Sequence, residues 1–370
     1  MRIVADANIP YVHDAFAPLG DVVTLPSGAL TAEAVRDAEL LLTRSTVQLN
    51  AALLAGSRVR FVATATIGID HLDTAFLDGA GIRWASAPGS NADSVVQWFA
   101  AAMARVPDLH GRQLGIVGVG NVGRRIERLW RALDVPPPLL CDPPRQRREG
   151  GGFVALDEIL ARCDLVTLHV PLTRQGEDAT FHLLDARRLR KDAWLVNACR
   201  GEVLDSASAY AVDNPLLCDV FEGEPSPDPR LVARALVATP HIAGHSLDGK
   251  ANGTKMIYDA ACAFLGVTPT WTPRQSLPPP PGAVTVPART DGVTAALVAV
   301  AAGYDVDADD AALRAIVAGP AAGRGAAFRR YREGYPERRE LDGRAVRFAL
   351  PLSNAIRMLN AYGVRVEPTV

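Results

Sequence analysis

The sequence predicts an α/β protein with two doubly wound parallel-sheet domains and a small α+β domain at the C-terminus. Three observations lead to this prediction. Short apolar segments alternate with helical ones from Arg2 to Leu265, which is typical of parallel sheets covered by helices. A glycine-rich turn follows one of the apolar segments at residues 118–123. Prolines at 269, 273 and 278–281 then form an extended linker before residues 284–370.

The first predicted domain comprises residues 1–91 and 250–275, joined by a helix expected over 247–265. Its strands are expected at residues 3–6, 40–43, 59–64 and 82–85. Ligands bind at the carboxyl ends of such strands, so the loops 8–10, 44–46 and 64–71 are candidate ligand contacts. Arg44 directly follows one strand, and its planar guanidinium suits a phosphate, with the Ser45 hydroxyl beside it. The alternative for Arg44 is an ordinary surface arginine, in which case Arg338 and Arg339 are the next phosphate candidates.

The second predicted domain, residues 92–249, carries a dinucleotide fingerprint. Gly118, Gly120 and Gly123 have the spacing G-x-G-x-x-G between a strand at 114–117 and a helix at 122–133, with Asn121 and Val122 inside the turn. Such a turn brings a pyrophosphate to a helix N-terminus and indicates a Rossmann-type domain. Asp142 lies nineteen residues beyond Gly123 and can accept hydrogen bonds from the adenosine ribose, which favours NAD over NADP. The alternative for Asp142 is a turn aspartate at a strand end.

The later strands of this domain are expected at residues 139–141, 165–169, 194–197, 216–220 and 236–239. Residues suited to hydride chemistry follow the last three of them. His241 is the candidate base because imidazole titrates near neutral pH. Glu224 can hold the other ring nitrogen, and Arg200 can bind a substrate carboxylate with its planar fork. Singly, these residues could be a helix cap, a turn residue and a surface ion pair, but their joint position after a dinucleotide fingerprint favours catalysis.

Composition limits the partners. The chain has 370 residues, with 39 Lys and Arg against 41 Asp and Glu, so its net charge of -2 predicts neither nucleic-acid nor membrane binding. The N-terminus resembles a strand and not a leader peptide, and no segment is long and apolar enough for a membrane span. The five cysteines form no C-x-x-C pair, which favours a reducing cytoplasm, and no metal site is expected.

The C-terminal segment 284–370 has no glycine fingerprint and fewer than ninety residues, so we expect an oligomerisation module. Glutamates interrupt its arginine-rich run, Phe328 to Arg339. We interpret that run as a solvated or subunit-facing surface and not as a nucleic-acid site.

The order of the motifs resembles the D-isomer-specific 2-hydroxyacid dehydrogenases. After the fingerprint and Asp142 come Asn197-Ala-Cys-Arg-Gly201, Asp219-Val-Phe-Glu-Gly-Glu-Pro225 and Pro240-His-Ile-Ala-Gly244. Further segments, such as Val4-Ala-Asp-Ala-Asn-Ile-Pro10 and Cys141-Asp-Pro-Pro144, are similar to the branch of that family that oxidises 4-phospho-D-erythronate. The likeness extends over nearly the whole chain.

The resemblance implies NAD-dependent oxidation at C2 to the 2-oxo acid, a step toward pyridoxal phosphate, in a homodimer held by the C-terminal domain. It implies catalysis by Arg200, Glu224 and His241, and substrate contacts from Ser45 and Thr66. The NAD contacts that it implies are Asp142, Ala198, Cys199, Arg200, Asp219 and Gly244. His245 stands where the family usually has a tyrosine that touches substrate, and the segments 105–110 and 200–219 are shorter than expected.

Two other functions stay open. One is a related dehydrogenase for another 2-hydroxy acid, such as phosphoglycerate or glycerate. The other is a catalytically silent NAD-binding protein that reports nucleotide state to a partner. The set of Arg200, Glu224 and His241 argues against the second.

Overall fold

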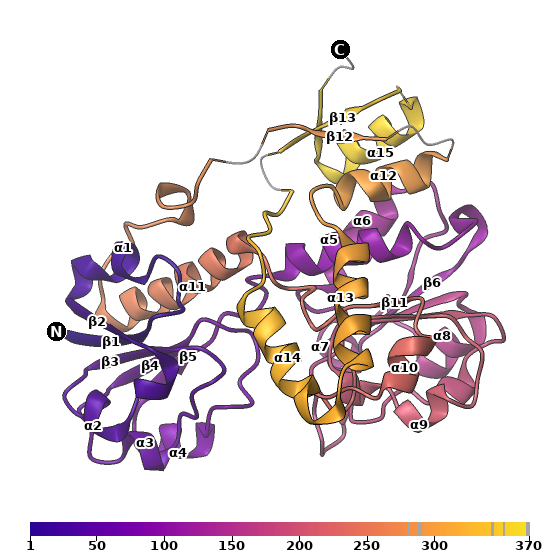
Figure 1. The fold of residues 1–370 in the computed structure, drawn as a ribbon. Helices are drawn as coiled ribbons and strands as arrows, with labels where there is room; N and C mark the ends of the chain where they lie inside the picture. The colour runs from indigo at the N-terminus through magenta and orange to yellow at the C-terminus, as the bar shows by residue number, and fades with distance from the viewer. Residues whose placement is uncertain (280–281, 288–290, 342–343, 351, 368–370) are drawn as a thin grey trace. The chain divides into compact units, whose positions relative to one another are not determined.

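The computed structural model describes residues 1–279, 282–287, 291–341, 344–350 and 352–367. The chain divides into two compact units, Met1–Asn91 with Ser246–Pro279 and Ala92–His245 with Pro280–Val370 (Figure 1). Each unit contains a parallel sheet, and a third small sheet lies near the C-terminus, so the predicted fold class is confirmed. Within the described residues, no helix is long and apolar enough to cross a membrane.

The first unit is built on a five-stranded parallel sheet in the order β2-β1-β3-β4-β5. Its strands are β1 (Arg2–Asp6), β2 (Asp21–Leu25), β3 (Leu40–Thr43), β4 (Phe61–Thr64) and β5 (Arg83–Ala85). One hydrophobic core packs α1 (Val12–Phe16) and α11 (Leu247–Leu265) against the sheet. A second core holds α2 (Ala32–Val35), α3 (Ala51–Leu54) and α4 (Thr74–Gly79), seen on the opposite face in Figure 1.

The strand β2 was not expected from the sequence. It pairs with β1 at the edge of the sheet, and its residues are exposed or only half-buried. An edge strand of this kind has a weak apolar pattern, which explains why the hydrophobic alternation alone did not reveal it.

The second unit contains a six-stranded parallel sheet in the order β11-β10-β9-β8-β6-β7. Its strands are β6 (Leu114–Val117), β7 (Leu139–Cys141), β8 (Leu165–Leu168), β9 (Trp194–Asn197), β10 (Leu216–Cys218) and β11 (Val237–Ala238). Its helices are α5 (Ala92–Met103), α6 (Gly123–Ala132), α7 (Pro143–Glu149), α8 (Leu156–Arg162), α9 (Ser206–Ala209) and α10 (Pro229–Arg234). The strand order reverses between β6 and β8, so the glycine turn after β6 lies at the topological switch point where such sheets bind nucleotides.

The short connection after residue 200 leaves this sheet regular. Only a 3₁₀ turn at Gly201–Val203 and the four-residue helix α9 lie between β9 and β10, yet the two strands pair in parallel with Cys218 opposite Asn197. The shortening therefore does not disturb the strands that carry Arg200 and Asp219 at their ends.

The C-terminal part of the second unit is α+β, as expected. Its parallel sheet is formed by β12 (Val284–Val286), β13 (Ala345–Phe348) and β14 (Arg365–Val366). Its helices are α12 (Gly292–Val300), α13 (Val306–Ala318), α14 (Ala321–Glu333) and α15 (Ser353–Tyr362).

These C-terminal elements share a core with the six-stranded sheet. Leu297 and Met358 belong to the same buried cluster as Phe99 and Trp130. On the sheet edge, an Asp310 oxygen on α13 accepts the Ala238 N–H of β11 at 2.7 Å. The helix α13 thus satisfies an edge strand that would otherwise expose an unpaired donor.

Candidate active site

The turn between β6 and α6 has the geometry of a phosphate-binding loop. Gly118 has φ +87°, and a Cβ there would lie 2.6 Å from the carbonyl oxygen of His169. A Cβ at Gly123 would lie 2.1 Å from the Gly118 oxygen, so the fold itself needs both glycines. A Cβ at Gly120 would meet nothing within 4 Å. The glycine at 120 therefore leaves open space at the N-terminus of α6, which fits the pyrophosphate of a dinucleotide.

The other residues of this turn are half-buried. Asn121 and Val122 precede α6, and the Asn121 carbonyl accepts a hydrogen bond from Arg125 at 2.8 Å. His169, across from Gly118, bonds through Nε2 with the Thr167 hydroxyl at 2.8 Å. Burial lowers the pKa of His169 to about 3, so this imidazole is neutral and adds no charge beside the turn.

Asp142 links the glycine turn to α7. One carboxylate oxygen accepts the Arg145 N–H at 2.9 Å and caps α7, while the other accepts the Val119 N–H at 2.8 Å. The sequence offered a turn aspartate at a strand end as the alternative, and the structure shows Asp142 directly after β7 as the cap of α7. Each carboxylate oxygen can accept more than one hydrogen bond, so capping is compatible with a ribose contact.

The loop after β9 positions Arg200. The Asn197 side chain accepts the Cys199 N–H at 3.1 Å and donates to the Arg200 carbonyl at 3.0 Å. A Cβ at Gly201 would lie 2.0 Å from the Phe221 carbonyl carbon, so this loop packs directly on the segment that follows β10. Ala198 and Cys199 are half-buried, and burial raises the pKa of the Cys199 thiol to about 11.

Asp219 anchors the loop that carries His241. It is buried, and its oxygens accept the Thr239 hydroxyl at 2.6 Å, the Ile242 N–H at 2.8 Å and the Ala243 N–H at 2.9 Å. Burial raises the pKa of Asp219, against the opposing effects of the nearby His241 charge and of these hydrogen bonds. The sequence proposed Asp219 as a cofactor contact, and the structure adds a role in shaping the loop after β11.

His241 and Glu224 form a hydrogen-bonded pair. Nδ1 of His241 lies 2.6 Å from Oε2 of Glu224, and Oε1 of Glu224 accepts the Phe221 N–H at 2.8 Å. Burial alone would raise the pKa of Glu224, but the charge and hydrogen bond of His241, the Phe221 N–H and the charge of Arg332 hold it below its ordinary value. The carboxylate is therefore ionised at neutral pH and fixes the proton on Nδ1. Nε2 is then the acceptor of the ring, as a general base requires.

The residues after His241 turn toward the C-terminal elements. The His245 N–H donates to the Ile242 carbonyl at 2.8 Å, and the His245 ring meets the ring of Tyr335 edge-on at 5.9 Å between centroids. Gly244 and His245 are both half-buried.

The remaining predicted substrate residues lie in the first unit. Arg44 follows β3 and contacts the Asn8 carbonyl at 3.5 Å, and Ser45 beside it is exposed. After β4, the hydroxyls of Thr64 and Thr66 lie 2.7 Å apart. These side chains share the carboxyl edge of the five-stranded sheet.

Sequence reasoning missed the part that the C-terminal segment plays. The interpretation of the arginine-rich run as a solvated or subunit-facing surface is wrong for Arg338, which is only 5% exposed and donates to the Ala243 carbonyl. Arg332 donates to the His241 carbonyl at 3.1 Å. These bonds span 95 and 91 residues, and no local spacing signals such a distant contact.

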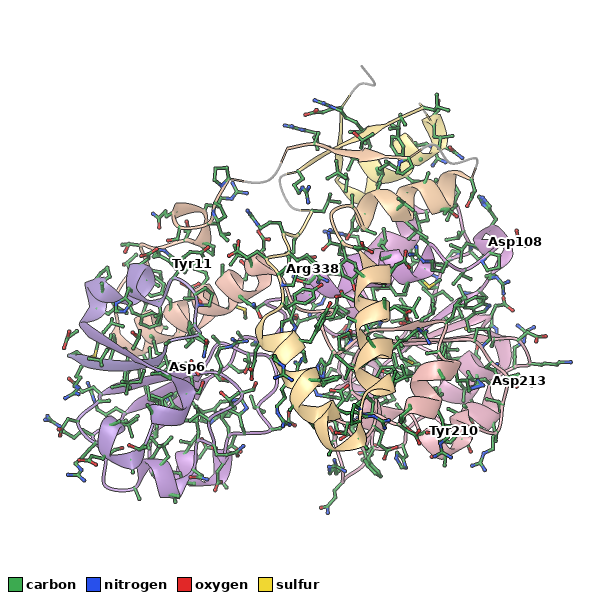
Figure 2. The ribbon with its side chains drawn as sticks, viewed as in Figure 1. Asp6, Tyr11, Asp108, Tyr210, Asp213 and Arg338 are labelled. Atoms are coloured by element: carbon green, nitrogen blue, oxygen red, sulfur yellow. The ribbon has the colours of Figure 1, made fainter. Side chains whose placement is uncertain are left out.

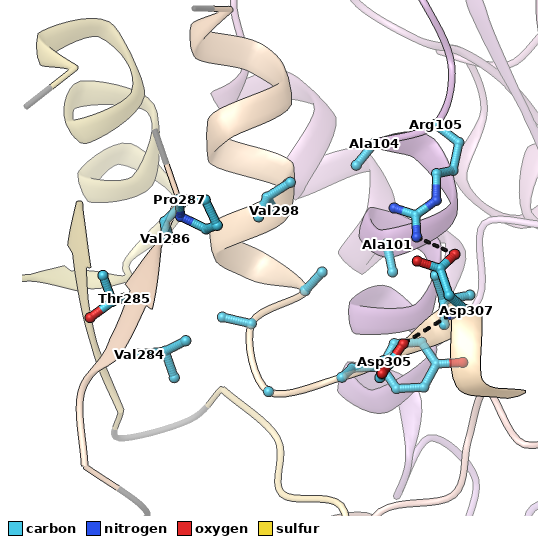
Figure 3. A pocket seen from close by; sticks show the side chains of 15 residues that line it. Ala101, Ala104, Arg105, Val284, Thr285, Val286, Pro287, Val298, Asp305 and Asp307 are labelled. Carbon is cyan, nitrogen blue, oxygen red and sulfur yellow. Dashed lines mark hydrogen bonds and ion pairs between the residues drawn. The ribbon is translucent and has the colours of Figure 1, made fainter. Parts of the chain in front are cut away.

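A cavity of about 270 Å³ lies between α5 and the C-terminal elements, with Arg105 and Asp307 paired at its edge (Figure 3). Tyr304, which also lines it, stacks against the Arg338 guanidinium at 4.4 Å. None of the predicted site residues lines this cavity, so it is separate from the candidate active site.

Known proteins are similar to this chain in sequence and in fold. Residues 90–243 match the family model described as D-isomer specific 2-hydroxyacid dehydrogenase, NAD binding domain. A Pseudomonas syringae pv. syringae protein named erythronate-4-phosphate dehydrogenase is 44% identical over 378 residues, covering 98% of this chain and 99% of that protein. The chain belongs to the erythronate-4-phosphate dehydrogenase family. A member of that family from Azotobacter vinelandii is 43% identical over the same shares of both chains.

Solved structures support the fold over about three quarters of this erythronate-4-phosphate dehydrogenase family member. The NAD⁺-bound 3-phosphoglycerate dehydrogenase of Entamoeba histolytica matches with a TM-score of 0.60 and 20% identity, covering 72% of this chain and 95% of that one. The TT0316 protein of Thermus thermophilus matches with a TM-score of 0.59 and 23% identity, covering 73% and 98%. At these identities the likeness concerns the fold alone.

Proposed function

We propose that this protein oxidises 4-phospho-D-erythronate at C2 to (R)-3-hydroxy-2-oxo-4-phosphobutanoate with NAD, in pyridoxine and pyridoxal 5'-phosphate biosynthesis. The observation that carries the proposal is the bonded His241–Glu224 pair, in a chain that is 44% identical, over 98% of its length, to a protein named erythronate-4-phosphate dehydrogenase. When bound, NAD supplies the acceptor for the hydride that leaves C2.

The protein's own residues handle the proton and the charge of the substrate. Nε2 of His241 takes the C2 hydroxyl proton, and the ionised Glu224 stabilises the imidazolium that results. The Arg200 guanidinium binds the substrate carboxylate and polarises the C2 oxygen in the reverse direction. His241 and Glu224 are 31% and 19% exposed, so the base can reach a ligand while its partner is largely shielded from water.

NAD would be held along the carboxyl edge of the six-stranded sheet. The open space at Gly120, at the N-terminus of α6, fits the pyrophosphate, and Asp142 fits the adenosine ribose. The full proposed set is Gly118, Gly120, Asn121, Val122, Gly123, Asp142, Ala198, Cys199, Arg200, Asp219 and Gly244.

For the substrate, we propose contacts from Arg44, Ser45, Thr66 and His245, with Arg44 on the phosphate. Residues 1–91 and 250–275 would form the substrate-binding lid domain and residues 92–249 the NAD domain. Residues 284–370 would join two subunits in a cytoplasmic homodimer. Sedimentation of the full chain at micromolar concentration would reveal a monomer if this last part is wrong.

A dehydrogenase for 3-phosphoglycerate or glycerate is the second candidate, because the phosphoglycerate enzyme shares the fold. That likeness covers 72% of this chain, whereas the relatives named erythronate-4-phosphate dehydrogenase are similar over 98% or 99% of it.

The test is an assay of the purified protein on 4-phosphoerythronate, 3-phosphoglycerate and glycerate, with NAD and a 2-oxo acid as re-oxidant. Co-purified NAD(H) is measured first. We expect the highest kcat/KM for 4-phosphoerythronate. A preference for either other acid would replace the proposed substrate, and no turnover with NAD bound would favour a silent regulatory protein.

A further inference from the structure

The helix α14 packs against the turn that carries Glu224. A Cβ at Gly325 would lie 2.9 Å from the Ser226 hydroxyl and 3.4 Å from Cγ of Pro225, so the helix approaches this turn at a glycine. About two turns further along the same face of the helix, Nε of Arg332 donates to the His241 carbonyl at 3.1 Å. A single C-terminal helix therefore touches the segments that carry both members of the proposed catalytic pair.

The backbone of His241 is held in an uncommon conformation. Its φ is +56°, in the left-handed region that non-glycine residues seldom adopt. Its N–H donates to the carbonyls of Asp219 at 2.7 Å and Thr239 at 3.0 Å, and its own carbonyl accepts from Arg332. The peptide groups on both sides of His241 are thus fixed by hydrogen bonds, and Arg332 donates the bond on the carbonyl side. Such a conformation persists only where its surroundings determine it.

A second arginine, which follows α14 in the chain, also donates a hydrogen bond to the loop that carries His241. The buried Arg338 donates to the carbonyls of Ala243 and Ser94 and stacks on Tyr304. Figure 2 shows Arg338 near the end of α14. The carbonyls of residues 241 and 243 therefore each accept from an arginine of the C-terminal segment.

We propose that Arg332 is a positioning residue for the His241–Glu224 pair, so that the C-terminal segment sets the orientation of the base. This inference rests on the proposed function. Its electrostatic part follows from the charged groups around the pair. Arg332 on α14 acts on Glu224, and the buried Asp219 after β10 acts on His241. The positive charge of Arg332 favours the ionised form of Glu224 and disfavours the binding of a further proton by the His241–Glu224 pair.

The test compares Arg332→Ala and Arg332→Lys with the control Arg330→Ala, which removes an exposed arginine from the same helix. For Arg332→Ala we expect kcat to fall about tenfold to a hundredfold, because small displacements of a catalytic group have effects of that size. NAD affinity should stay within about twofold of the wild type. The acid limb of the kcat/KM profile should move to higher pH, because the pair binds a proton more readily without the cation. Arg332→Lys should restore the position of the acid limb.

A readout without substrate separates this inference from the proposed function. The protein has seven histidines, and His241→Asn identifies the His241 ring signals in an NMR spectrum of the nitrogen-labelled protein. We expect the ring-nitrogen chemical shifts of His241, which report its bond to Glu224, to change in Arg332→Ala and to return in Arg332→Lys, whether or not 4-phosphoerythronate is the substrate. Unchanged ring shifts and an unchanged pH profile in Arg332→Ala would overturn the inference. So would a loss of kcat that Arg330→Ala reproduces.

Discussion

Nδ1 of His241 lies 2.6 Å from Oε2 of Glu224, while the other oxygen of that carboxylate accepts the Phe221 N–H. Both carboxylate oxygens are therefore engaged, and the ring is oriented by a partner that is itself fixed. Hydride transfer from a hydroxy acid to NAD needs a base that can accept the hydroxyl proton. Because Glu224 holds Nδ1, Nε2 of His241 is the ring nitrogen that can accept a proton, as the proposed mechanism requires.

His241→Asn should lower turnover by about 10²- to 10⁴-fold and leave NAD binding near normal. Asparagine tolerates the left-handed φ of +56° better than most residues, so this variant should keep the loop folded. Steady-state kinetics and a fluorescence titration with NADH measure the two effects. Unchanged turnover would remove His241 from the mechanism.

Glu224→Gln tests the pH dependence of the pair. The pKa of Glu224 is below its ordinary value of 4.5, because the favourable effects of His241, Phe221 and Arg332 outweigh burial. Its ionised form thus stabilises the fold above about pH 4.5, and this contribution is lost as the pH falls through the folded-state pKa.

Wild type should therefore unfold at a higher temperature than Glu224→Gln at pH 7, and the difference should shrink toward pH 3.5. Thermal unfolding followed by circular dichroism measures it. A difference that stays constant from pH 7 to 3.5 would contradict the assigned ionisation.

The glycine turn offers a matched pair of substitutions. Gly123→Ala places a Cβ 2.1 Å from the Gly118 oxygen and should destabilise the protein by about 1 to 3 kcal/mol. Gly120→Ala meets nothing within 4 Å, so its stability should match wild type while NAD affinity falls by about tenfold or more. Equal NAD affinity in Gly120→Ala and wild type would mean that the pyrophosphate lies elsewhere.

Local sequence patterns sufficed for the parts of the site that lie at strand ends. The glycine spacing, the order of Arg200, Glu224 and His241, and the parallel sheets were all predicted, because a strand followed by a special residue is a local signal. The pairing of His241 with Glu224, seventeen residues apart, was also predicted, since both follow adjacent strands.

Distant contacts had no such signal. The sequence showed that Phe328 to Arg339 is rich in arginine, but burial of Arg338 and the bond from Arg332 to His241 depend on how α14 packs. The proline-rich linker likewise suggested a separate C-terminal module, whereas the C-terminal helices share a core with α5 and α6. Composition marks a linker in the sequence, but it does not determine which surfaces the following residues bury.

Asp142→Ala tests whether Asp142 contacts NAD in addition to capping α7. Asp142→Ala should weaken NAD binding and narrow the preference for NAD over NADP. It should also cost about 1 kcal/mol of stability, because α7 loses its cap. Asp228→Ala removes a similar cap from α10 and is the control. If both variants keep the wild-type ratio of NAD to NADP affinity, Asp142 serves the fold alone.

Arg44→Ala tests how a protein with a net charge of -2 recognises a phosphorylated substrate. Without a general positive field, recognition must be local, and Arg44 follows β3 at the carboxyl edge of its sheet, where ligands bind. Each charge-assisted hydrogen bond to phosphate contributes about 1.5 to 3 kcal/mol. We therefore expect the KM for 4-phosphoerythronate to rise about tenfold to a hundredfold, with little change for erythronate.

The control for this prediction is Arg83→Ala, because Arg83 begins β5 and so lies at the amino edge of the same sheet, away from ligands. It should leave KM for both substrates unchanged. If Arg44→Ala weakens erythronate and 4-phosphoerythronate equally, Arg44 holds the carboxylate or the fold. The phosphate contact would then be sought at Arg339. The neighbouring Arg338 is a poorer candidate, because its buried guanidinium already donates to the backbone carbonyls of Ser94 and Ala243 inside the second unit.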